Sequence, residues 1–409
     1  MSGRRPPKEL MHFQNRAPRR SRLLAPALFL VLLLAGCTAE ASPPNGDPGA
    51  KAPPVHLKIA FLENLMPEGA YERMVPAFQG AKLALDQAFA NGDLPIDVEI
   101  VPQDIGDPQR MTDVLSADVA DPSYVGAIGS PFWSEPAAAG SRLSDAGLAT
   151  VSLSSVGPTN PGWSSWFRAV APLSDQAVEV GAFLDRSRSG EHGVCLASDG
   201  STYGSAFVDA VTRATRRHVL SRSVIPTGEP IPERTLRQIR SGGCAALVFG
   251  GFGSDAGLIR IELDAAGLSG VRLIGADGMR DRTFLSVAET SGDGSVASCS
   301  CVDLGASTSL PAQQFIHDYQ SEFGGPPASY AVEGWDMGRL YVAAIRSGAR
   351  TRSEVAAYLS KVGSFTGLAK TYGFSRSGGL LPSTRLVQLF RESGGRWLPV
   401  GAPTGSASG

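Results

Sequence analysis

The chain has 409 residues, of which 43% are hydrophobic and 19% charged, and its formal net charge is −2. This is an ordinary globular composition, with a length suited to about two domains. The near-neutral charge gives no reason to expect nucleic acid as a partner, because binding it requires a concentrated basic field.

The N-terminal residues predict export. A basic stretch precedes an apolar run, Leu23 to Leu34, which is too short to span a bilayer but fits the h-region of a signal peptide. The run ends in Leu-Ala-Gly-Cys, which resembles a bacterial lipobox, so we expect residues 1–37 to be a lipoprotein signal peptide acylated at Cys37. The alternative is a plain signal peptide with a chance cysteine. General secretion is the default route, and Arg19-Arg20 leaves the twin-arginine route open.

Residues 38–54 predict a flexible linker, because they are rich in Pro, Ala, Gly and Ser and show no apolar periodicity. No other apolar run approaches membrane length. We therefore expect a globular body on a lipid tether, at the extracytoplasmic face of the cell membrane.

From Val55 onward, short apolar runs alternate with helical patterns. The first strand is expected at 55–62, a helix follows at 71–91, and a second strand at 97–101 leads to Asp107-Pro108. Asp107 can cap a helix that opens at Pro108, which we interpret as a structural role. The same alternation recurs between 193 and 275. It predicts an α/β fold with two Rossmann-like lobes, each built on a parallel central sheet.

The central stretch, Val125 to Pro158, reads as strand, polar loop, helix, strand and polar loop. The first loop carries Trp133 and Ser134, and the second carries Ser154 and Ser155. Loops that follow parallel strands lie at one edge of the sheet, which is where ligands bind in open α/β sheets. Ser134 has an alternative role as the cap of the helix that follows.

This stretch resembles the leucine/isoleucine/valine-binding group of type I periplasmic binding proteins, the solute receptors of ABC importers. In that pattern, the two loops grip the α-carboxylate and α-ammonium of an amino acid. The resemblance places these contacts on Trp133, Ser134, Ser154 and Ser155, and Val156 stands where a hydroxyl is usual. It implies two lobes joined by a three-segment hinge, an ABC permease as partner, and no cofactor, metal or catalytic residues.

Three loops of the second lobe complete the predicted site. By the same resemblance, Tyr203 and Phe252 stand where aromatic residues cover the ligand, and Asp277 stands where an acidic residue pairs with the α-ammonium. A carboxylate at the end of an apolar strand must also remain solvated or find a cation. The alternatives are a packing residue at the helix start for Tyr203, ordinary core for Phe252, and a helix cap for Asp277.

The expected domains follow from these assignments. After the signal peptide and linker come 55–170 (first part of lobe 1), 171–298 (first part of lobe 2), 299–368 (second part of lobe 1), 369–401 (C-terminal hairpin of lobe 2) and 402–409 (a disordered tail).

Four cysteines remain in the body, and outside the cytoplasm an even number permits disulfides with three possible connectivities. Buried thiols are the alternative. Cys299 and Cys301 lie two apart in an expected strand, a spacing that we expect to suit neither a mutual bridge nor a metal. The histidines lack metal-ligand spacing.

The sequence thus predicts a monomeric, lipid-anchored receptor for an amino acid or a similar small polar molecule. Phosphate-loop and serine-hydrolase motifs are absent from the sequence. The alternatives are a ligand sensor that signals to a membrane partner, and a hydrolase or amidase of the cell envelope.

Overall fold

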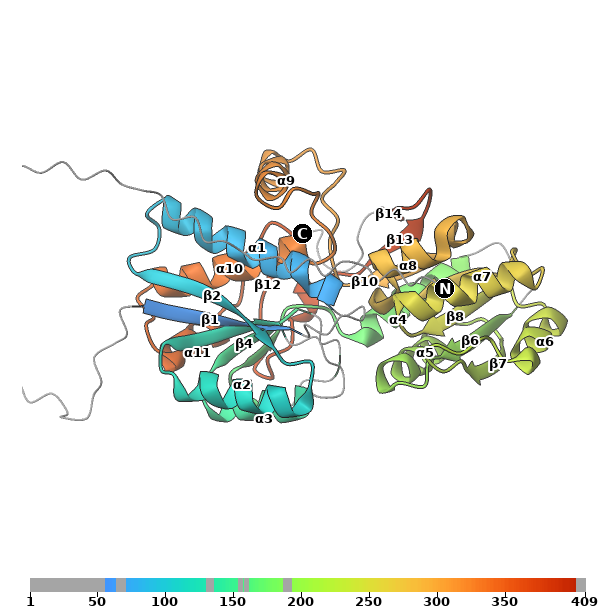
Figure 1. Ribbon diagram of the computed structural model, residues 1–409, viewed down its shortest axis with the longest axis horizontal. Helices are drawn as coiled ribbons and strands as arrows, with labels where there is room; N and C mark the ends of the chain where they lie inside the picture. The colour runs from blue at the N-terminus through green and yellow to red at the C-terminus, as the bar shows by residue number, and fades with distance from the viewer. Residues whose placement is uncertain are drawn as a thin grey trace, which may run out of the picture. The chain divides into compact units, whose positions relative to one another are not determined.

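Strands and helices alternate along the body of the chain, and the strands form two main sheets (Figure 1). The computed structural model describes residues 56–63, 71–129, 136–153, 157, 162–186 and 193–401. The described residues all belong to one compact unit. Outside them lie Cys37, the linker and tail, and four predicted site residues: Trp133, Ser134, Ser154 and Ser155.

The first sheet has five described strands, all parallel. In spatial order they are β2 (Asp97–Asp104), β1 (His56–Glu63), β3 (Tyr124–Gly129), β4 (Ala149–Ser152) and β5 (Trp166–Arg168). The register pairs Glu63 with Asp104 and Leu62 with Gly129, so β1, β2 and β3 end at the same edge. We call this the carboxyl edge, and the opposite one the amino edge.

Helices cover both faces of this sheet. On one face lie α1 (Tyr71–Ala90), α10 (Ala331–Arg346) and α11 (Arg352–Ser360), and on the other lie α2 (Pro108–Ala120) and α3 (Pro136–Asp145) (Figure 1). The alternation of side chains along β1 explains both layers. Leu57, Ile59 and Phe61 pack with α1 and α10, whereas Ala60 and Leu62 pack with α2 and α3.

Two local predictions about this part are confirmed. The Asp107 side chain accepts a hydrogen bond from the backbone N–H of Arg110 at 2.9 Å, and Pro108 is the first residue of α2. Asp107 is therefore a helix cap, as its position before a proline predicts.

The second sheet has seven described strands, which combine a parallel centre with an antiparallel edge. In spatial order they are β14 (Trp397–Pro399), β13 (Gln388–Glu392), β10 (Val296–Cys299), β9 (Arg272–Gly275), β8 (Ala246–Gly250), β6 (Val194–Ser198) and β7 (Val219–Val224). The antiparallel pair β13 and β14 is the hairpin that the sequence predicts.

Five described helices are associated with the second sheet: α4 (Leu173–Arg186), α5 (Thr202–Ala214), α6 (Glu233–Gly242), α7 (Gly253–Ala265) and α8 (Arg282–Ala288). The last four follow its parallel strands in the chain, whereas α4 follows β5 of the first sheet. Helix α9 (Leu310–Phe323) packs instead beside α1 and α10 of the first sheet, and a short pair, β11 (Phe365–Thr366) and β12 (Thr371–Tyr372), lies in the chain after α11.

Two carboxylates of α10 hold the segments that connect the two sheets. Glu333 Oε1 accepts the backbone N–H of Val302 at 2.7 Å, just after β10. Asp336, one turn later, accepts the backbone N–H groups of Leu368 and Ala369 at 2.5 and 2.9 Å. Both carboxylates are buried, and burial raises the pKa of Asp336 to about 6. Helix α10 is therefore the anchor of both connections.

The described residues form two disulfides. Cys195 bridges Cys244 with their Cα atoms 5.7 Å apart, and Cys299 bridges Cys301 with their Cα atoms 5.1 Å apart. The expectation that Cys299 and Cys301 would not bridge each other is wrong. It assumed an extended strand across both residues, but β10 ends at Cys299, so the backbone is free to turn between them.

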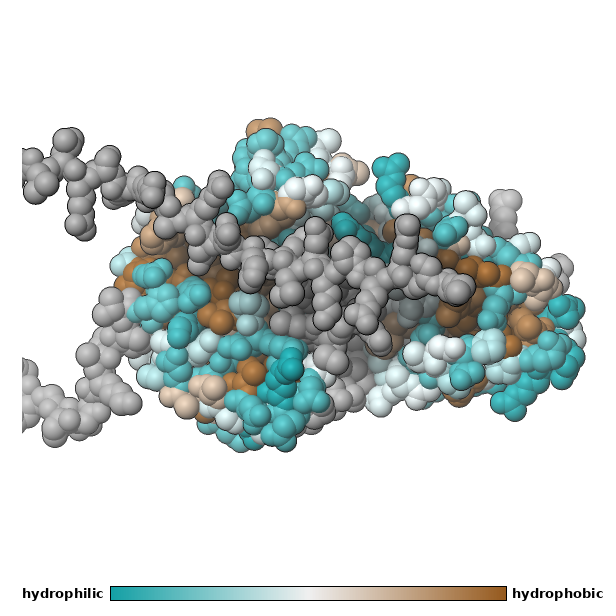
Figure 2. Space-filling model, viewed as in Figure 1, coloured by the Kyte–Doolittle hydropathy of each residue, from teal (hydrophilic) through white to brown (hydrophobic). Residues whose placement is uncertain are grey.

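Apolar side chains also reach the surface. Figure 2 shows brown, hydrophobic residues over α7, where Leu258 and Ile261 are 41% and 40% exposed. None of the described helices combines the length and hydropathy needed to cross a membrane.

Candidate functional site

Acidic and aromatic residues gather where strands of the second sheet end. Asp199 follows β6 and holds the turn into α5, because its carboxylate accepts both the N–H and the hydroxyl of Ser201. Ser201 in turn caps α5 by accepting the N–H of Gly204 at 2.9 Å. Burial raises the pKa of Asp199. This aspartate is thus occupied in shaping the loop that carries Tyr203.

Asp277 follows β9, and two tyrosine hydroxyls occupy its carboxylate. Tyr203 donates to Oδ1 at 2.6 Å, and Tyr330 donates to Oδ2 at 2.9 Å. The N–H of Gly278 bonds to both Oδ1 and the Tyr203 hydroxyl. Each carboxylate oxygen has about two acceptor positions, so Oδ2 retains capacity for one further donor. The helix-cap alternative for Asp277 is wrong, because Asp281 caps α8 through the N–H of Phe284.

The Tyr330 contact joins the two sheets. Tyr330 immediately precedes α10 and has a φ of 67°, a backbone conformation that is uncommon for a bulky residue. Burial, followed by the charge of Asp277, raises the pKa of the Tyr330 hydroxyl well above its usual range. It is therefore a proton donor to Asp277. Strained backbone of this kind is typical of functional sites.

The two predicted aromatic residues pack on one another. The rings of Tyr203 and Phe252 are stacked with centroids 5.3 Å apart and an interplanar angle of 20°. Tyr203 is buried, whereas Phe252 is 37% exposed at the start of α7. Phe252 is thus not ordinary core, and with Tyr203 it forms an aromatic surface next to Asp277.

Gln176, in the first turn of α4, fixes the backbone beneath Asp277. Its side-chain oxygen accepts the N–H of Asp277 at 3.2 Å and the hydroxyl of Ser298 at 3.0 Å. Gln176 is fully buried, so these bonds are shielded from water. The amide positions the loop that presents the Asp277 carboxylate.

A buried cation lies three residues beyond Asp277. Arg280 hydrogen-bonds to Ser329 and to Cys301 Sγ, forms an ion pair with Asp303 at 3.5 Å, and stacks on Phe390 with its guanidinium carbon 3.6 Å from the ring centroid. Burial lowers the pKa of its guanidinium to about 10. Its charge is balanced by fixed groups, so it offers little attraction for an anionic ligand.

At the carboxyl edge of the first sheet, β3 ends in a glycine that no other residue can replace without strain. Gly129 has a φ of 114°, and a Cβ there would lie 2.3 Å from the carbonyl oxygen of Leu62. Gly129, the last described residue before the loop predicted to carry Trp133 and Ser134, thus lies beside the end of β1. The last residue of β1 is Glu63, a buried carboxylate.

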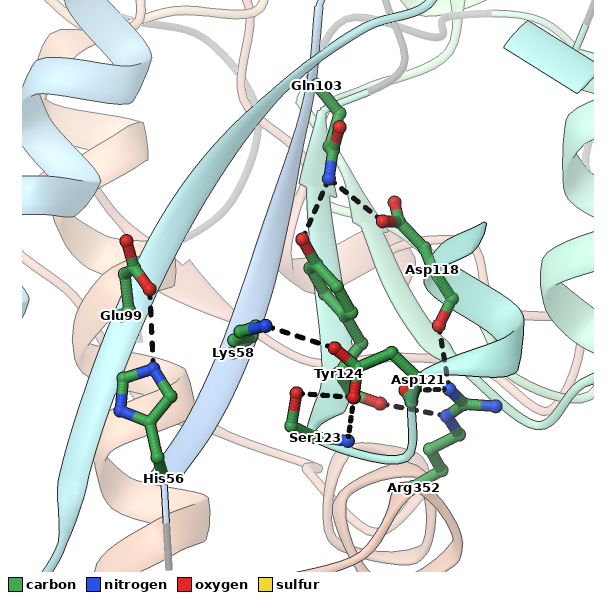
Figure 3. Close-up of polar contacts among 9 residues, drawn as sticks. All are labelled: His56, Lys58, Glu99, Gln103, Asp118, Asp121, Ser123, Tyr124 and Arg352. Atoms are coloured by element: carbon green, nitrogen blue, oxygen red, sulfur yellow. Dashed lines mark hydrogen bonds and ion pairs between the residues drawn. The ribbon is translucent and has the colours of Figure 1, made fainter. Parts of the chain in front are cut away.

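A separate polar network begins at the amino edge of the same sheet and extends to Gln103, the register partner of Leu62 (Figure 3). Arg352 donates to four backbone carbonyl groups at 2.7 to 2.9 Å, and Lys58 pairs with Asp121 at 3.0 Å. Gln103 connects Asp118 to the Tyr124 hydroxyl, and burial raises the pKa of Asp118 to about 6. These groups bind one another and the ends of α2 and β3, so we interpret the network as structural.

Among the described residues, no three His, Cys, Asp or Glu side chains are grouped so as to hold a metal ion. The arrangement at Asp277 suits a different task. It places one carboxylate, with a remaining acceptor position, beside a stacked aromatic pair.

Two parallel-stranded α/β layers, connected by segments anchored on α10 and joined at Asp277, define a two-lobed binding-protein fold. A sequence profile described as "Periplasmic binding protein" matches residues 56–391, and the chain belongs to this family. No curated protein sequence matches the chain. By this family it is a binding protein.

Solved structures share the fold at low sequence identity. The branched-chain amino acid transporter substrate-binding protein LivJ from Streptococcus pneumoniae, in complex with isoleucine, has a TM-score of 0.75 and 18% identity over 86% of this chain and 99% of that one. The leucine-binding protein LivK from Thermotoga maritima has a TM-score of 0.73 and 16% identity over 85% and 98%. A solute-binding protein from R. palustris, in complex with benzoate, has a TM-score of 0.68 and 18% identity over 86% and 98%.

The structure brings three of the seven predicted ligand residues together, namely Tyr203, Phe252 and Asp277, and the other four lie outside the described residues. Sequence reasoning missed Tyr330, which bonds to Asp277. Its only signal in the sequence is that an aromatic residue stands directly before the helical pattern of α10.

Proposed function

We propose that the chain is the extracytoplasmic, lipid-anchored receptor of an ABC importer and that its ligand is an amino acid or a similar small molecule with a positively charged nitrogen. The hydrogen bond from Tyr330 to Asp277 carries the proposal, because it unites the start of α10 with the end of β9 at a carboxylate. That carboxylate retains an acceptor position and lies beside the stacked rings of Tyr203 and Phe252.

The charge at this position favours amino acids over simple acids. Related folds bind either kind of ligand, since one neighbour holds isoleucine and another holds benzoate. A carboxylate attracts an ammonium through a charge-assisted hydrogen bond and repels an anion. The buried cation Arg280 is already paired with Asp303. We therefore expect the ammonium of the ligand to lie at Asp277, with Ser134, Ser154, Ser155 and Trp133 as contacts from the first lobe.

A binding screen tests the ligand class. In isothermal titration calorimetry, the processed protein should bind at least one amino acid stoichiometrically and without turnover, and it should not bind benzoate comparably. Binding of simple acids alone would contradict the assignment of Asp277. Hydrolysis of an amide during the titration would contradict receptor function.

The lipid anchor requires its own test. Cells that express the full chain should incorporate labelled palmitate into it and retain it in the membrane fraction, because a diacylated cysteine provides two acyl chains. The Cys37→Ser variant should lose both the label and the membrane association. Equal labelling of the two proteins would contradict acylation at Cys37. Co-purification of the acylated protein with a permease would support the partner.

A further inference from the structure

Glu63 is the last residue of β1 and lies at the carboxyl edge of the first sheet. It continues the row of Leu57, Ile59 and Phe61 on β1, the row that faces α1 and α10.

Helices α1 and α10 run parallel and begin at the same edge. Gly334 lies against Ala77, and Gly338, one turn later in α10, lies against Ala81, one turn later in α1. Because α1 follows β1 in the chain, its first residues lie toward the carboxyl edge of the sheet. The start of α10, and with it Tyr330, therefore lies toward the edge at which Glu63 ends β1.

The Glu63 carboxylate has no partner within the described part of the chain. Its side chain is 2% exposed, and its Oε1 atom is buried without a hydrogen bond. Other buried carboxylates with one orphaned oxygen have the second oxygen bonded: Asp118 to Gln103, Asp255 to the N–H of Gly228, Glu333 to the N–H of Val302, and Glu392 to the N–H of Gly395. Leaving a buried carboxylate unpaired is unfavourable, because the group has lost its hydration without gaining a partner.

The neighbouring Asp104 makes an ionised carboxylate at Glu63 less favourable still. Asp104 is the register partner of Glu63 on β2, and its charge adds to burial in raising the pKa of Glu63 to about 7. Asp104 forms an ion pair with Arg110, so its own charge is balanced. Glu63 is left as the acidic group at this edge that lacks a counterpart among the described residues.

We propose that Glu63 is a specificity-determining residue that accepts a hydrogen bond from a second cationic group of the ligand, so that the ligand class is a basic amino acid rather than a branched-chain one. This inference rests on the proposed function, because it assumes that an amino acid binds at Asp277. A second cation satisfies the orphaned oxygen and offsets the cost of burying the carboxylate.

Matched ligands test the inference. Lysine and norleucine share an unbranched four-carbon side-chain stem, but only lysine ends in an ammonium group, and arginine and citrulline form a second pair that differs in charge. By titration calorimetry at pH 7.5, the wild-type protein should bind lysine or arginine at least tenfold more tightly than its neutral counterpart. The Glu63→Gln variant should lose this preference and bind the neutral ligands as the wild type does.

The control variant is Glu99→Gln, which removes the same charge from β2 at an exposed position paired with His56. It should leave the preference unchanged. Equal affinity of the wild type for lysine and norleucine, or an unchanged preference in Glu63→Gln, would overturn the inference while receptor function stands. Failure of every charged and neutral amino acid to bind would overturn both.

Discussion

Charged groups at the two edges of the five-stranded sheet differ in whether they have hydrogen-bond partners. Toward the amino edge, Arg352 and Lys58 have fixed partners, and the partners are carbonyl groups or carboxylates of the same lobe (Figure 3). At the carboxyl edge, Glu63 is buried with an orphaned oxygen. The first arrangement stabilises the fold, and the second is the one for which we propose that a ligand supplies the missing partner. Arg352 and Lys58 thus mark the structural side of the sheet, and Glu63 marks the proposed binding side.

The largest expected effect comes from removing Arg352 from the polar network at the amino edge. Arg352→Ala should lower the free energy of unfolding by about 3 kcal/mol, because it leaves four backbone carbonyl groups without their charged donor. Urea denaturation measures this loss, and ligand affinity should be unchanged. Arg352→Lys retains the charge but reaches fewer carbonyl groups, so its free energy of unfolding should lie between those of the wild type and Arg352→Ala. A loss of ligand affinity in Arg352→Ala would contradict the structural role that we assign to the amino edge.

At the carboxyl edge, removing a charge should raise the free energy of unfolding. The folded-state pKa of Glu63, about 7, lies above its ordinary value of 4.5, so folding takes up a proton between these values and stability falls as pH rises through 7. Glu63→Gln should therefore be more stable than the wild type by about 2 to 3 kcal/mol at pH 8, and the difference should shrink toward pH 5. Urea denaturation of both proteins at pH 5.5 and 8 measures it. A pH-independent difference would refute the assignment.

Asp277 tests the site at the second sheet. Asp277→Asn should weaken the binding of an ammonium-bearing ligand about tenfold, equivalent to ~1.4 kcal/mol, because the charge is lost while an acceptor for the tyrosine hydroxyls remains. Alanine would leave two buried hydroxyl groups without an acceptor, so asparagine is the cleaner variant. Tyr330→Phe retains the carboxylate charge and should bind ligand more tightly than Asp277→Asn. Unchanged calorimetric affinity in Asp277→Asn would remove this residue from the site.

The smallest effect is expected at the exposed start of β1. His56 contacts Asp97 at 2.8 Å and Glu99 at 3.3 Å, and the three side chains are largely solvated. His56→Gln should change the free energy of unfolding by less than ~0.5 kcal/mol, because exposed ion pairs contribute little. A larger loss in urea denaturation would show that the amino edge extends its structural role to the surface.

Periodicity was sufficient to predict the alternating α/β architecture, since each strand and helix carries its own pattern along the chain. The Asp107 cap and the hairpin of β13 and β14 were predictable for the same reason, because their partners are close in sequence. The contacts of Asp277 were not, since Tyr203 and Tyr330 lie 74 and 53 residues away from it. The bridge between Cys299 and Cys301 escaped prediction because it depends on the residue at which a strand ends.

Helix α10 couples local events at Asp277 to the connections between the sheets. Its leading residue, Tyr330, bonds to the Asp277 carboxylate, and within two turns Glu333 and Asp336 hold Val302, Leu368 and Ala369. A ligand that bonds to the same carboxylate would therefore act on the helix that holds both connecting segments. Ligand binding and the conformation of both connecting segments would then be coupled through this one helix.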